Sequence, residues 1–204
     1  MNKSHYLYQM SNCLIETDGG YVKLTDKNGV NLYMLKENDK VKFRINFDIS
    51  NHNYDLNKAI GFKLFGLMAE LNKDIIDRIA LSKYDDDSTE IDMGIILCRF
   101  GTDIGLAQKY IYSHSVIEKN GDLTTITSEQ IPKPDNFAVP PRSEPALSSY
   151  SKIDFRVMND HYCSVVYVFV LDLEEDLPIY MEKLPGSLMH KVFSRLKVFI
   201  ETLV

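Results

Sequence analysis

The 204-residue sequence has no tryptophan, only three cysteines and seven prolines, and no excess of positive charge. So few cysteines exclude a small scaffold held together by disulfides. A composition of 45% apolar and 25% charged residues excludes an intrinsically disordered chain. The formal net charge of -6 at pH 7 argues against a dedicated nucleic-acid-binding protein, because such proteins are usually basic. The longest apolar run, Val165 to Leu171, is far shorter than the roughly 20 residues of a membrane-spanning helix.

Common catalytic signatures are also absent from the sequence. It contains neither of the glycine-rich nucleotide-binding motifs GxGxxG and GxxxxGK(S/T). The GxSxG nucleophile motif and the HExxH metal motif are also absent. Cys13, Cys98 and Cys163 are odd in number, widely spaced and set in apolar runs, which is typical of reduced, buried thiols. We therefore expect an intracellular protein of a reducing compartment, the cytoplasm, that requires no cofactor.

Several segments have the patterns of β-strands. Apolar and polar residues alternate strictly from Val41 to Ile49, which predicts a strand with one buried and one solvated face. The nearly continuous apolar runs 91–100 and 163–171 predict buried strands. Asn28-Gly29 and Asn120-Gly121 predict tight hairpins, because a type I′ turn needs positive φ at both central residues.

Three segments have the three-to-four-residue spacing of helices. Apolar residues recur in this way from Asp55, a predicted N-cap, to Leu71. A short second helix is predicted at 75–80, and a final amphipathic helix at 187–203 with Ser187 as its N-cap. We therefore predict a single α+β domain over residues 1–204. It is a mixed, mainly antiparallel β-sheet with two covering helices and a C-terminal amphipathic helix.

Two groups of side chains have the residue types of a metal or catalytic site. Asp85, Asp86 and Asp87 are consecutive, whereas a calcium loop needs spaced ligands and a glycine, so a solvated acidic loop is the better interpretation. His161 and Cys163 stand two residues apart, but structural zinc sites usually need close ligand pairs at both ends of the site. We therefore expect no metal site and no catalytic residue, and we expect folding without zinc or calcium.

Carboxylates at the end of the predicted strand 163–171 support an enzymatic alternative. Asp172 and Glu174 occupy a position where carboxylates sometimes carry out acid–base or metal-assisted chemistry, which would suit a small hydrolase or nuclease. The plainer interpretation is that they solvate the strand end and discourage edge pairing.

Two oppositely charged segments are candidates for contacts between copies of the chain. The basic residues of 36–44 and the acidic residues of 85–90 would complement each other in a head-to-tail contact. Self-association is further favoured by the 12 tyrosines, because tyrosine is enriched in protein interfaces. The candidate interface residues are Lys36, Lys40, Lys42, Arg44, Asp85, Asp86 and Asp87.

The proline- and serine-rich segment 129–150 is expected to be an exposed loop, because proline removes ladder donors and fixes φ. Part of it resembles a proline-rich ligand for an aromatic groove, although an ordinary connecting loop has the same composition. The residues of this candidate partner loop are Pro140, Pro141, Arg142 and Pro145.

The order of the predicted elements resembles one protein family. The alternating strand 40–49 leads into the Asp-capped helix 55–71, and the proline-rich segment precedes two strong strands, 152–158 and 163–171. This order resembles the α+β core of matrix proteins of non-segmented negative-strand RNA viruses, of the rhabdovirus and bornavirus kind. Members of that family are commonly basic, and their proline-rich budding motif ends in tyrosine. This chain departs from both features: it is acidic, and Pro140-Pro141 is followed by Arg142 and Ser143.

The resemblance implies a non-enzymatic, self-associating structural or interaction protein, found in the virion, that contacts the membrane surface and the nucleocapsid. Its implied partners are copies of itself, other viral or host proteins and a membrane surface. Nucleic acid is not expected as a direct ligand, given the negative net charge. Two alternatives come from other classes: the hydrolase or nuclease described above, and a phage- or virus-encoded protein that sequesters a host partner.

Overall fold

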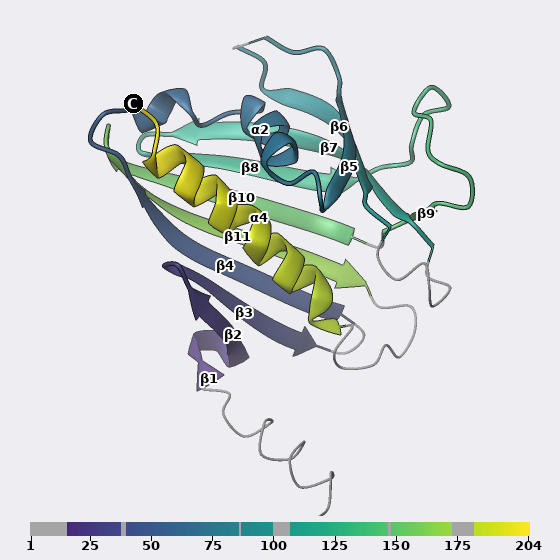
Figure 1. The fold of residues 1–204 in the computed structure, drawn as a ribbon, viewed down its shortest axis with the longest axis horizontal. Coiled ribbons are helices and arrows are strands. Elements are labelled where there is room, and N and C mark those ends of the chain that lie inside the picture. The colour runs from purple at the N-terminus through teal and green to yellow at the C-terminus, as the bar shows by residue number, and fades with distance from the viewer. Residues whose placement is uncertain (1–15, 38–39, 86, 100–106, 147, 173–181) are drawn as a thin grey trace, which may run out of the picture.

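One large, twisted β-sheet is covered on one face by two helices, α2 (Lys63–Leu71) and α4 (Leu184–Glu201), in the computed structural model (Figure 1). The structure describes residues 16–37, 40–85, 87–99, 107–146, 148–172 and 182–204. The predicted α+β class, with a mainly antiparallel sheet and a C-terminal helix, is confirmed.

Within the described residues the sheet has eleven strands, and its main path runs in the order β1-β2-β3-β4-β11-β10-β8-β7-β6-β5. Neighbours on this path are antiparallel, and the short β9 pairs with β7 in parallel. The chain thus builds four strands from one edge, crosses to the other edge, and returns until β11 pairs with β4. The strands are β1 (Glu16–Thr17), β2 (Tyr21–Lys27), β3 (Val30–Glu37), β4 (Lys40–Ser50), β5 (Ile76–Leu81), β6 (Glu90–Leu97), β7 (Lys109–Asn120), β8 (Leu123–Gln130), β9 (Glu144–Pro145), β10 (Ser148–Asn159) and β11 (Tyr162–Asp172).

Both predicted Asn-Gly hairpins are present. Asn28 and Gly29 adopt φ angles of 57° and 70° and join β2 to β3, as a type I′ turn requires. Gly121, with a φ of 60°, and Asp122 form the turn between β7 and β8. This second turn starts one residue later than the Asn-Gly pair predicted, because Asn120 still pairs with Leu123.

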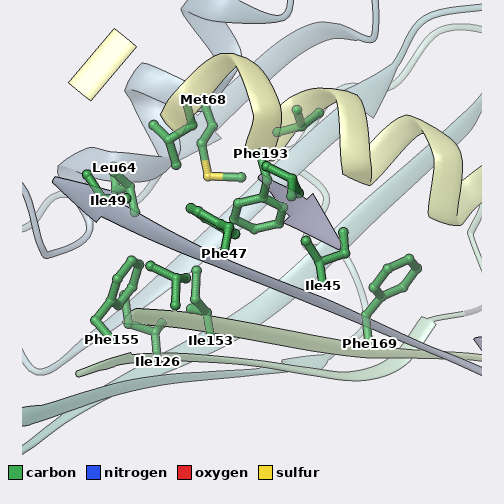
Figure 2. Close-up of a cluster of buried hydrophobic side chains, with 14 of the residues drawn as sticks. Ile45, Phe47, Ile49, Leu64, Met68, Ile126, Ile153, Phe155, Phe169 and Phe193 are labelled. Atoms are coloured by element: carbon green, nitrogen blue, oxygen red, sulfur yellow. The ribbon is translucent and has the colours of Figure 1, made fainter. Parts of the chain in front are cut away.

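The strictly alternating segment forms β4, which lies between β3 and β11. Its apolar side chains face the helices, and Figure 2 shows Ile45, Phe47 and Ile49 in one cluster with Met68 of α2 and Phe193 of α4. Full burial of each such side chain stabilises the fold by about 1.5–3 kcal/mol. This strand therefore fixes where the two helices pack. Its buried residues are Val41, Phe43, Ile45, Phe47 and Ile49.

The predicted helix 55–71 is split in two. Asp55 caps a short 3-10 helix, η2 (Leu56–Lys58), because its side chain accepts a hydrogen bond from the backbone nitrogen of Asn57 at 3.0 Å. Gly61 then adopts a φ of 155°, which is not helical, and α2 begins only at Lys63. The predicted cap is confirmed, and the continuous helix is wrong.

Most of the segment 75–80 belongs to the edge strand β5 (Ile76–Leu81), and the predicted second helix is wrong. The register of β5 against β6 shifts between Ile76 and Arg78. A shift of this kind adds one unpaired residue, so that Ile76 and Ile79 both face the helices although they stand three residues apart. The register shift therefore gives the apolar residues of this strand the three-residue spacing that is typical of a helix.

Helix α4 begins at Leu184, three residues before the predicted start, and Pro185 and Gly186 lie in its first turn. Ser187 was predicted to be the N-cap, and this prediction is wrong. Ser187 lies inside the helix, and its hydroxyl donates a 3.0 Å hydrogen bond to the backbone oxygen of Lys183. Gly186 packs so closely on the ring of Phe43 that a β-carbon at this position would overlap it. The expected apolar stripe is confirmed by buried Val192, Phe193, Leu196 and Ile200.

Candidate functional site

A cavity of about 120 Å³ lies between the sheet and the two helices. None of the described residues that line it carries a charged side chain. Because burial of an unpaired charge is very costly, the cavity suits an uncharged group. The lining residues are Leu64, Phe65, Met68, Ile75, Ile76, Ile79, Met93, Ile95, Leu97, Ile111, Ser113, Ile126, Ser128, Gln130, Ser151, Ile153, Tyr167, Met189, Val192 and Phe193.

The helix side of the cavity is apolar. Figure 2 shows Leu64, Met68 and Phe193 facing Ile126 and Ile153, which come from the strands on the opposite side. Methionine side chains on both helices can adapt to the shape of a bound molecule, because they are unbranched and polarizable. The helix residues of the lining are Leu64, Phe65, Met68, Met189, Val192 and Phe193.

The sheet side of the cavity carries a strip of hydroxyl and amide groups. Ser113 on β7 lies opposite Gln130 on β8, and Ser128 lies opposite Ser151 on β10. Tyr167 extends the strip to β11. These residues occupy the inward-facing positions of four adjacent strands, where a plain core would be apolar.

Much of this polar strip is already hydrogen-bonded within the protein. Ser128 Oγ lies 2.8 Å from Ser115 Oγ. Burial raises the pKa of Tyr167 to about 12, although a hydrogen bond with Ser151 acts in the opposite direction. The phenol therefore stays protonated at neutral pH.

Ser113 is the exception in the strip. Its side chain is 4% exposed, and its Oγ has no hydrogen-bond partner among the described residues. A buried hydroxyl left unpaired costs about 1–3 kcal/mol. A molecule in the cavity that offers a hydrogen-bonding oxygen would remove this cost.

An ion-pair cluster holds α4 against the turn that follows α2. Asp74 accepts a hydrogen bond from Lys191 Nζ at 2.6 Å and pairs with the guanidinium of Arg195. Hydrogen bonds from Arg195 and Lys191 hold the pKa of Asp74 well below its usual range. Two neighbours in sequence, Ile75 and Val192, line the cavity, so this cluster lies directly beside the cavity wall.

The C-terminal end of α4 is fixed separately. Asn51 is 3% exposed, and its Nδ2 donates to the backbone oxygens of Ile200 at 2.7 Å and Leu203 at 2.9 Å. The cavity lies under the other half of the helix, where Met189 and Phe193 contribute to the lining. Helix α4 is therefore held by Asn51 at its C-terminal end and by the Asp74 cluster nearer its middle, and its N-terminal half contributes to the wall of the cavity.

The basic residues of the predicted interface lie around β3 and β4. Arg44 faces away from the helices, with its guanidinium carbon 4.4 Å and 4.8 Å from the ring centroids of Tyr21 and Tyr33. Lys36 forms a 2.6 Å ion pair with Glu182, which precedes α4. The remaining two, Lys40 and Lys42, lie on β4.

The acidic residues of the predicted interface lie in the turn between β5 and β6, at the far edge of the sheet. Asp85 Oδ1 accepts from Ser88 Oγ at 3.0 Å and from the backbone nitrogen of Asp87 at 3.2 Å, so this carboxylate stabilises its own turn. Asp86 lies outside the described residues. The described parts of the chain contain no cluster of three or more His, Cys, Asp or Glu side chains that could hold a metal ion. Folding without zinc or calcium remains a prediction.

The other candidate residues of the sequence do not converge on a site. The ring of His161 is exposed, with Nδ1 3.0 Å from the backbone oxygen of Asn51, whereas Cys163 is 1% exposed. Burial raises the pKa of Cys163 to about 12, which makes it a poor nucleophile. Asp172 ends β11 opposite Lys40, and Glu174 lies outside the described residues.

The candidate partner loop is tied to the sheet at several points. Pro140, Pro141 and Arg142 form a turn closed by a 3.1 Å bond from the backbone nitrogen of Ser143 to the oxygen of Pro140. Pro145 belongs to β9 and pairs with β7. Nearby, Phe137 is buried against Gly94 and the ring of Tyr112. Recognition of this loop by a partner remains a prediction.

The cavity was not predicted from the sequence. Its signal lies in polar residues at inward-facing strand positions, such as Ser128 and Gln130, which follow Ile126 at intervals of two on β8. That signal becomes readable only when the sheet order is known, because the strip gathers residues from four strands. No helix in the described part of the chain is long and apolar enough to cross a membrane.

The long antiparallel sheet with a C-terminal helix across it is similar in fold to solved structures of StAR-related lipid transfer domains. The chain is similar to the lipid transfer and protein localization domain of human StarD13 (DLC2), with a TM-score of 0.68 and 12% identity over 100% of this chain and 99% of that one. Human StAR-related lipid transfer protein 5 matches with a TM-score of 0.67 and 10% identity, over 97% and 90%. A STAR-related lipid transfer protein from Xanthomonas axonopodis matches at 0.64 and 15%, over 89% and 98%. Neither a protein-family model nor a curated protein sequence matches the chain.

These likenesses overturn the expected family and function. The fold is that of StAR-related lipid transfer domains, so the interpretation as a viral matrix protein is wrong. The hydrolase or nuclease and the host-sequestering protein do not match these structures either. The error has a physical cause: the order of strands and helices along a chain is common to many α+β folds, whereas the pairing of distant strands distinguishes them.

Of the expected partners, a membrane or lipid surface is compatible with the observed fold. Contacts between copies of the chain and contacts with other proteins are not tested by it, and they remain predictions.

Proposed function

We propose that the protein binds an apolar lipid in the cavity under α4 and carries it between membranes. The observation that carries this proposal is an uncharged, largely apolar cavity enclosed by the sheet and both helices. Support comes from full-length similarity of fold to proteins whose names describe lipid transfer. An apolar ligand gains free energy by leaving water, at about 25 cal/mol per Å² of apolar surface buried.

The size of the cavity indicates a closed state. Its volume of about 120 Å³ is below the ~300–1,000 Å³ of ordinary ligand pockets. It is closer to the ~150 Å³ of an engineered apolar cavity that binds benzene. A lipid tail needs more room, and movement of the N-terminal half of α4 would supply it. Such a movement has to break the ion pair of Lys191 with Asp74 and the 3.0 Å contact of His190 Nε2 with the backbone oxygen of Val30, while Asn51 holds the C-terminal end.

The test is extraction and transfer of lipid from vesicles. Purified protein is incubated with vesicles made from a total yeast lipid extract, separated from them, and analysed by mass spectrometry for bound lipid. Movement of fluorescent lipid from donor to acceptor vesicles is measured in parallel. We expect a co-purifying lipid in about equimolar amount and faster transfer in the presence of protein. Protein that returns free of lipid and leaves the transfer rate unchanged would refute the proposal.

A matched pair of variants assigns the binding to the cavity. Ile111→Phe places a ring at an inward-facing position of β7 that lines the cavity, and we expect it to reduce bound lipid severalfold. Val116→Phe makes the same kind of change five residues along the strand, on the opposite face of the sheet. This control should bind like the unmodified protein. Equal loss in both variants would place the lipid elsewhere.

A further inference from the structure

We infer that the cavity selects an uncharged lipid with a hydroxyl or carbonyl oxygen, and that Ser113 Oγ is the group that recognises this oxygen. The inference rests on the proposed function and adds the class of lipid and the residue that discriminates it. The lipid lies with its oxygen against the sheet at β7 and with its hydrocarbon under α2 and α4.

The chemistry of the cavity wall excludes a charged head group inside it. The described lining residues include no lysine, arginine, histidine, aspartate or glutamate. A phosphate or carboxylate held there would lose its hydration without gaining an ion pair, at a cost far above that of an uncharged polar group. A phospholipid would therefore have to leave its head group outside the cavity, whereas an alcohol or ester can enter whole.

The hydrogen bonds of the polar strip single out Ser113 as the recognition group. The side chain of Ser128 is hydrogen-bonded to that of Ser115, and the side chain of Ser151 is hydrogen-bonded to that of Tyr167. Ser113 Oγ alone among the buried side-chain polar atoms of the described lining is without a partner. Its neighbours across the sheet are Met93 on β6 and Gln130 on β8. A ligand oxygen at this point can form a hydrogen bond with the unpaired hydroxyl of Ser113. A pure hydrocarbon offers no such partner.

Discrimination follows from this difference between the two ligands. A site with a buried hydroxyl disfavours an analogue that lacks the matching oxygen, because the hydroxyl is then sealed off without a partner. We expect an alcohol to bind about tenfold more tightly than the alkane of equal length, after allowance for their different transfer from water. Tenfold corresponds to about 1.4 kcal/mol.

The experiment compares three probes of equal chain length: octane, octanol and octylphosphocholine. Dissociation constants are measured by NMR titration of the isotope-labelled protein, and the shifted amides show whether each probe enters the cavity. The unmodified protein should prefer octanol over octane about tenfold, after correction by water-to-hydrocarbon transfer free energies. Octylphosphocholine should bind no more tightly than octane after the same correction, because its charged head group stays outside the cavity and cannot reach Ser113.

Variants of Ser113 assign the preference to its hydroxyl. Ser113→Ala should bind octane at least as well as before and should lose the preference for octanol. Ser113→Thr keeps a hydroxyl and should retain it. Ser194→Ala removes a hydroxyl on α4 that already bonds to the backbone oxygen of His190 at 2.8 Å, and it should change neither constant.

Three results would overturn the inference while leaving the proposed function intact. They are equal corrected affinities for octane and octanol, an octanol preference that survives in Ser113→Ala, and octylphosphocholine that binds more tightly than octane after the same correction. The second result would mean that Ser113 bonds only to an ordered water, for which the cavity has room. Failure of all three probes to bind, together with no lipid extracted from vesicles, would overturn the proposed function itself.

Discussion

Single inward-facing residues decide whether a strand contributes to the solid core or to the cavity. On β4 the inward positions are filled by large apolar side chains such as Phe43 and Phe47, which are at most 4% exposed. On β7 and β8 the equivalent positions hold Ser113 and Ser128, which are too small to reach the helices. The cavity therefore arises where short polar side chains replace long apolar ones on neighbouring strands.

At this scale the structure predicts that Cys163 resists modification in the folded protein. Burial, with a smaller contribution from the nearby Asp48, raises its pKa from 9.0 to about 12. At pH 9.0 a thiol with the ordinary pKa is half ionised, whereas this one is protonated and buried. We expect iodoacetamide to modify the less buried Cys98 much faster, as measured by mass spectrometry of the separate peptides.

The same pKa gives the sign of an alkaline effect on stability. Between pH 9 and about 12 the thiol of Cys163 ionises in the unfolded chain and stays protonated in the folded one. Its contribution to the free energy of unfolding is therefore present below pH 9 and lost as the pH rises through this range. Equal alkylation rates for Cys98 and Cys163 in the native protein would contradict the burial of Cys163, on which the predicted resistance and the predicted alkaline effect both depend.

At the scale of elements, the first turn of α4 depends on a close approach between helix and sheet. A β-carbon at Gly186 would overlap the ring of Phe43, so Gly186→Ala should push the start of the helix away from β4. Overpacking of this kind costs about 1–3 kcal/mol in the free energy of unfolding. Urea denaturation measures it.

Helix α2 supplies the matched control. Gly66 lies within this helix, and a β-carbon there would meet no atom within 4 Å. Gly66→Ala should raise the free energy of unfolding by about 0.5–1 kcal/mol, because alanine favours the helix. A gain in stability for both glycine variants would show that the contact at Phe43 is not tight.

The ion-pair cluster between α4 and the turn after α2 should control how often the cavity opens. Asp74→Asn removes the charge that pairs with Lys191 and Arg195. We expect faster amide exchange in the N-terminal half of α4 and severalfold faster lipid transfer between vesicles. Glu70→Gln is the control, because Glu70 pairs with Lys73 at an exposed site that does not involve α4.

The pH dependence of this cluster has a definite sign. The folded-state pKa of Asp74 is lowered from 3.8, so its stabilising effect is present above that pH and is lost as the pH falls below it. The difference in free energy of unfolding between the unmodified protein and Asp74→Asn should therefore shrink in acid. A difference that grows below pH 3.8 would contradict the assigned hydrogen bonds.

Individual elements were predictable wherever the signal was local. Strict alternation identified β4, an Asn-Gly pair identified the β2–β3 hairpin, and an apolar stripe identified α4. Strand β5 was not predictable, because its shifted register places Ile76 and Ile79 on one face at helical spacing. The cavity was not predictable either, because its polar strip combines residues from Ser113 to Tyr167 that share no local motif.

At the scale of the whole molecule, the basic and acidic segments of the predicted interface lie far apart on the sheet. Lys42 lies on β4, in the first half of the strand order, and Asp87 lies in the turn between β5 and β6 at the opposite edge. Lys42 and Asp87 are therefore too far apart to form an ion pair within one copy of the chain. It suits a contact between copies, in which the basic side of one molecule meets the acidic turn of the next.

The prediction is weak, salt-sensitive self-association at micromolar concentration, measured by light scattering. Lys42→Glu alone and Asp87→Lys alone should each weaken it, because each places like charges opposite each other. The double variant Lys42→Glu with Asp87→Lys should restore it, since opposite charges then face each other again. Arg44 is left unchanged because its guanidinium packs on Tyr21 and Tyr33, and its replacement would disturb the sheet itself. A strictly monomeric protein at low salt would exclude this contact, and association that ignores the single reversals would place the interface elsewhere.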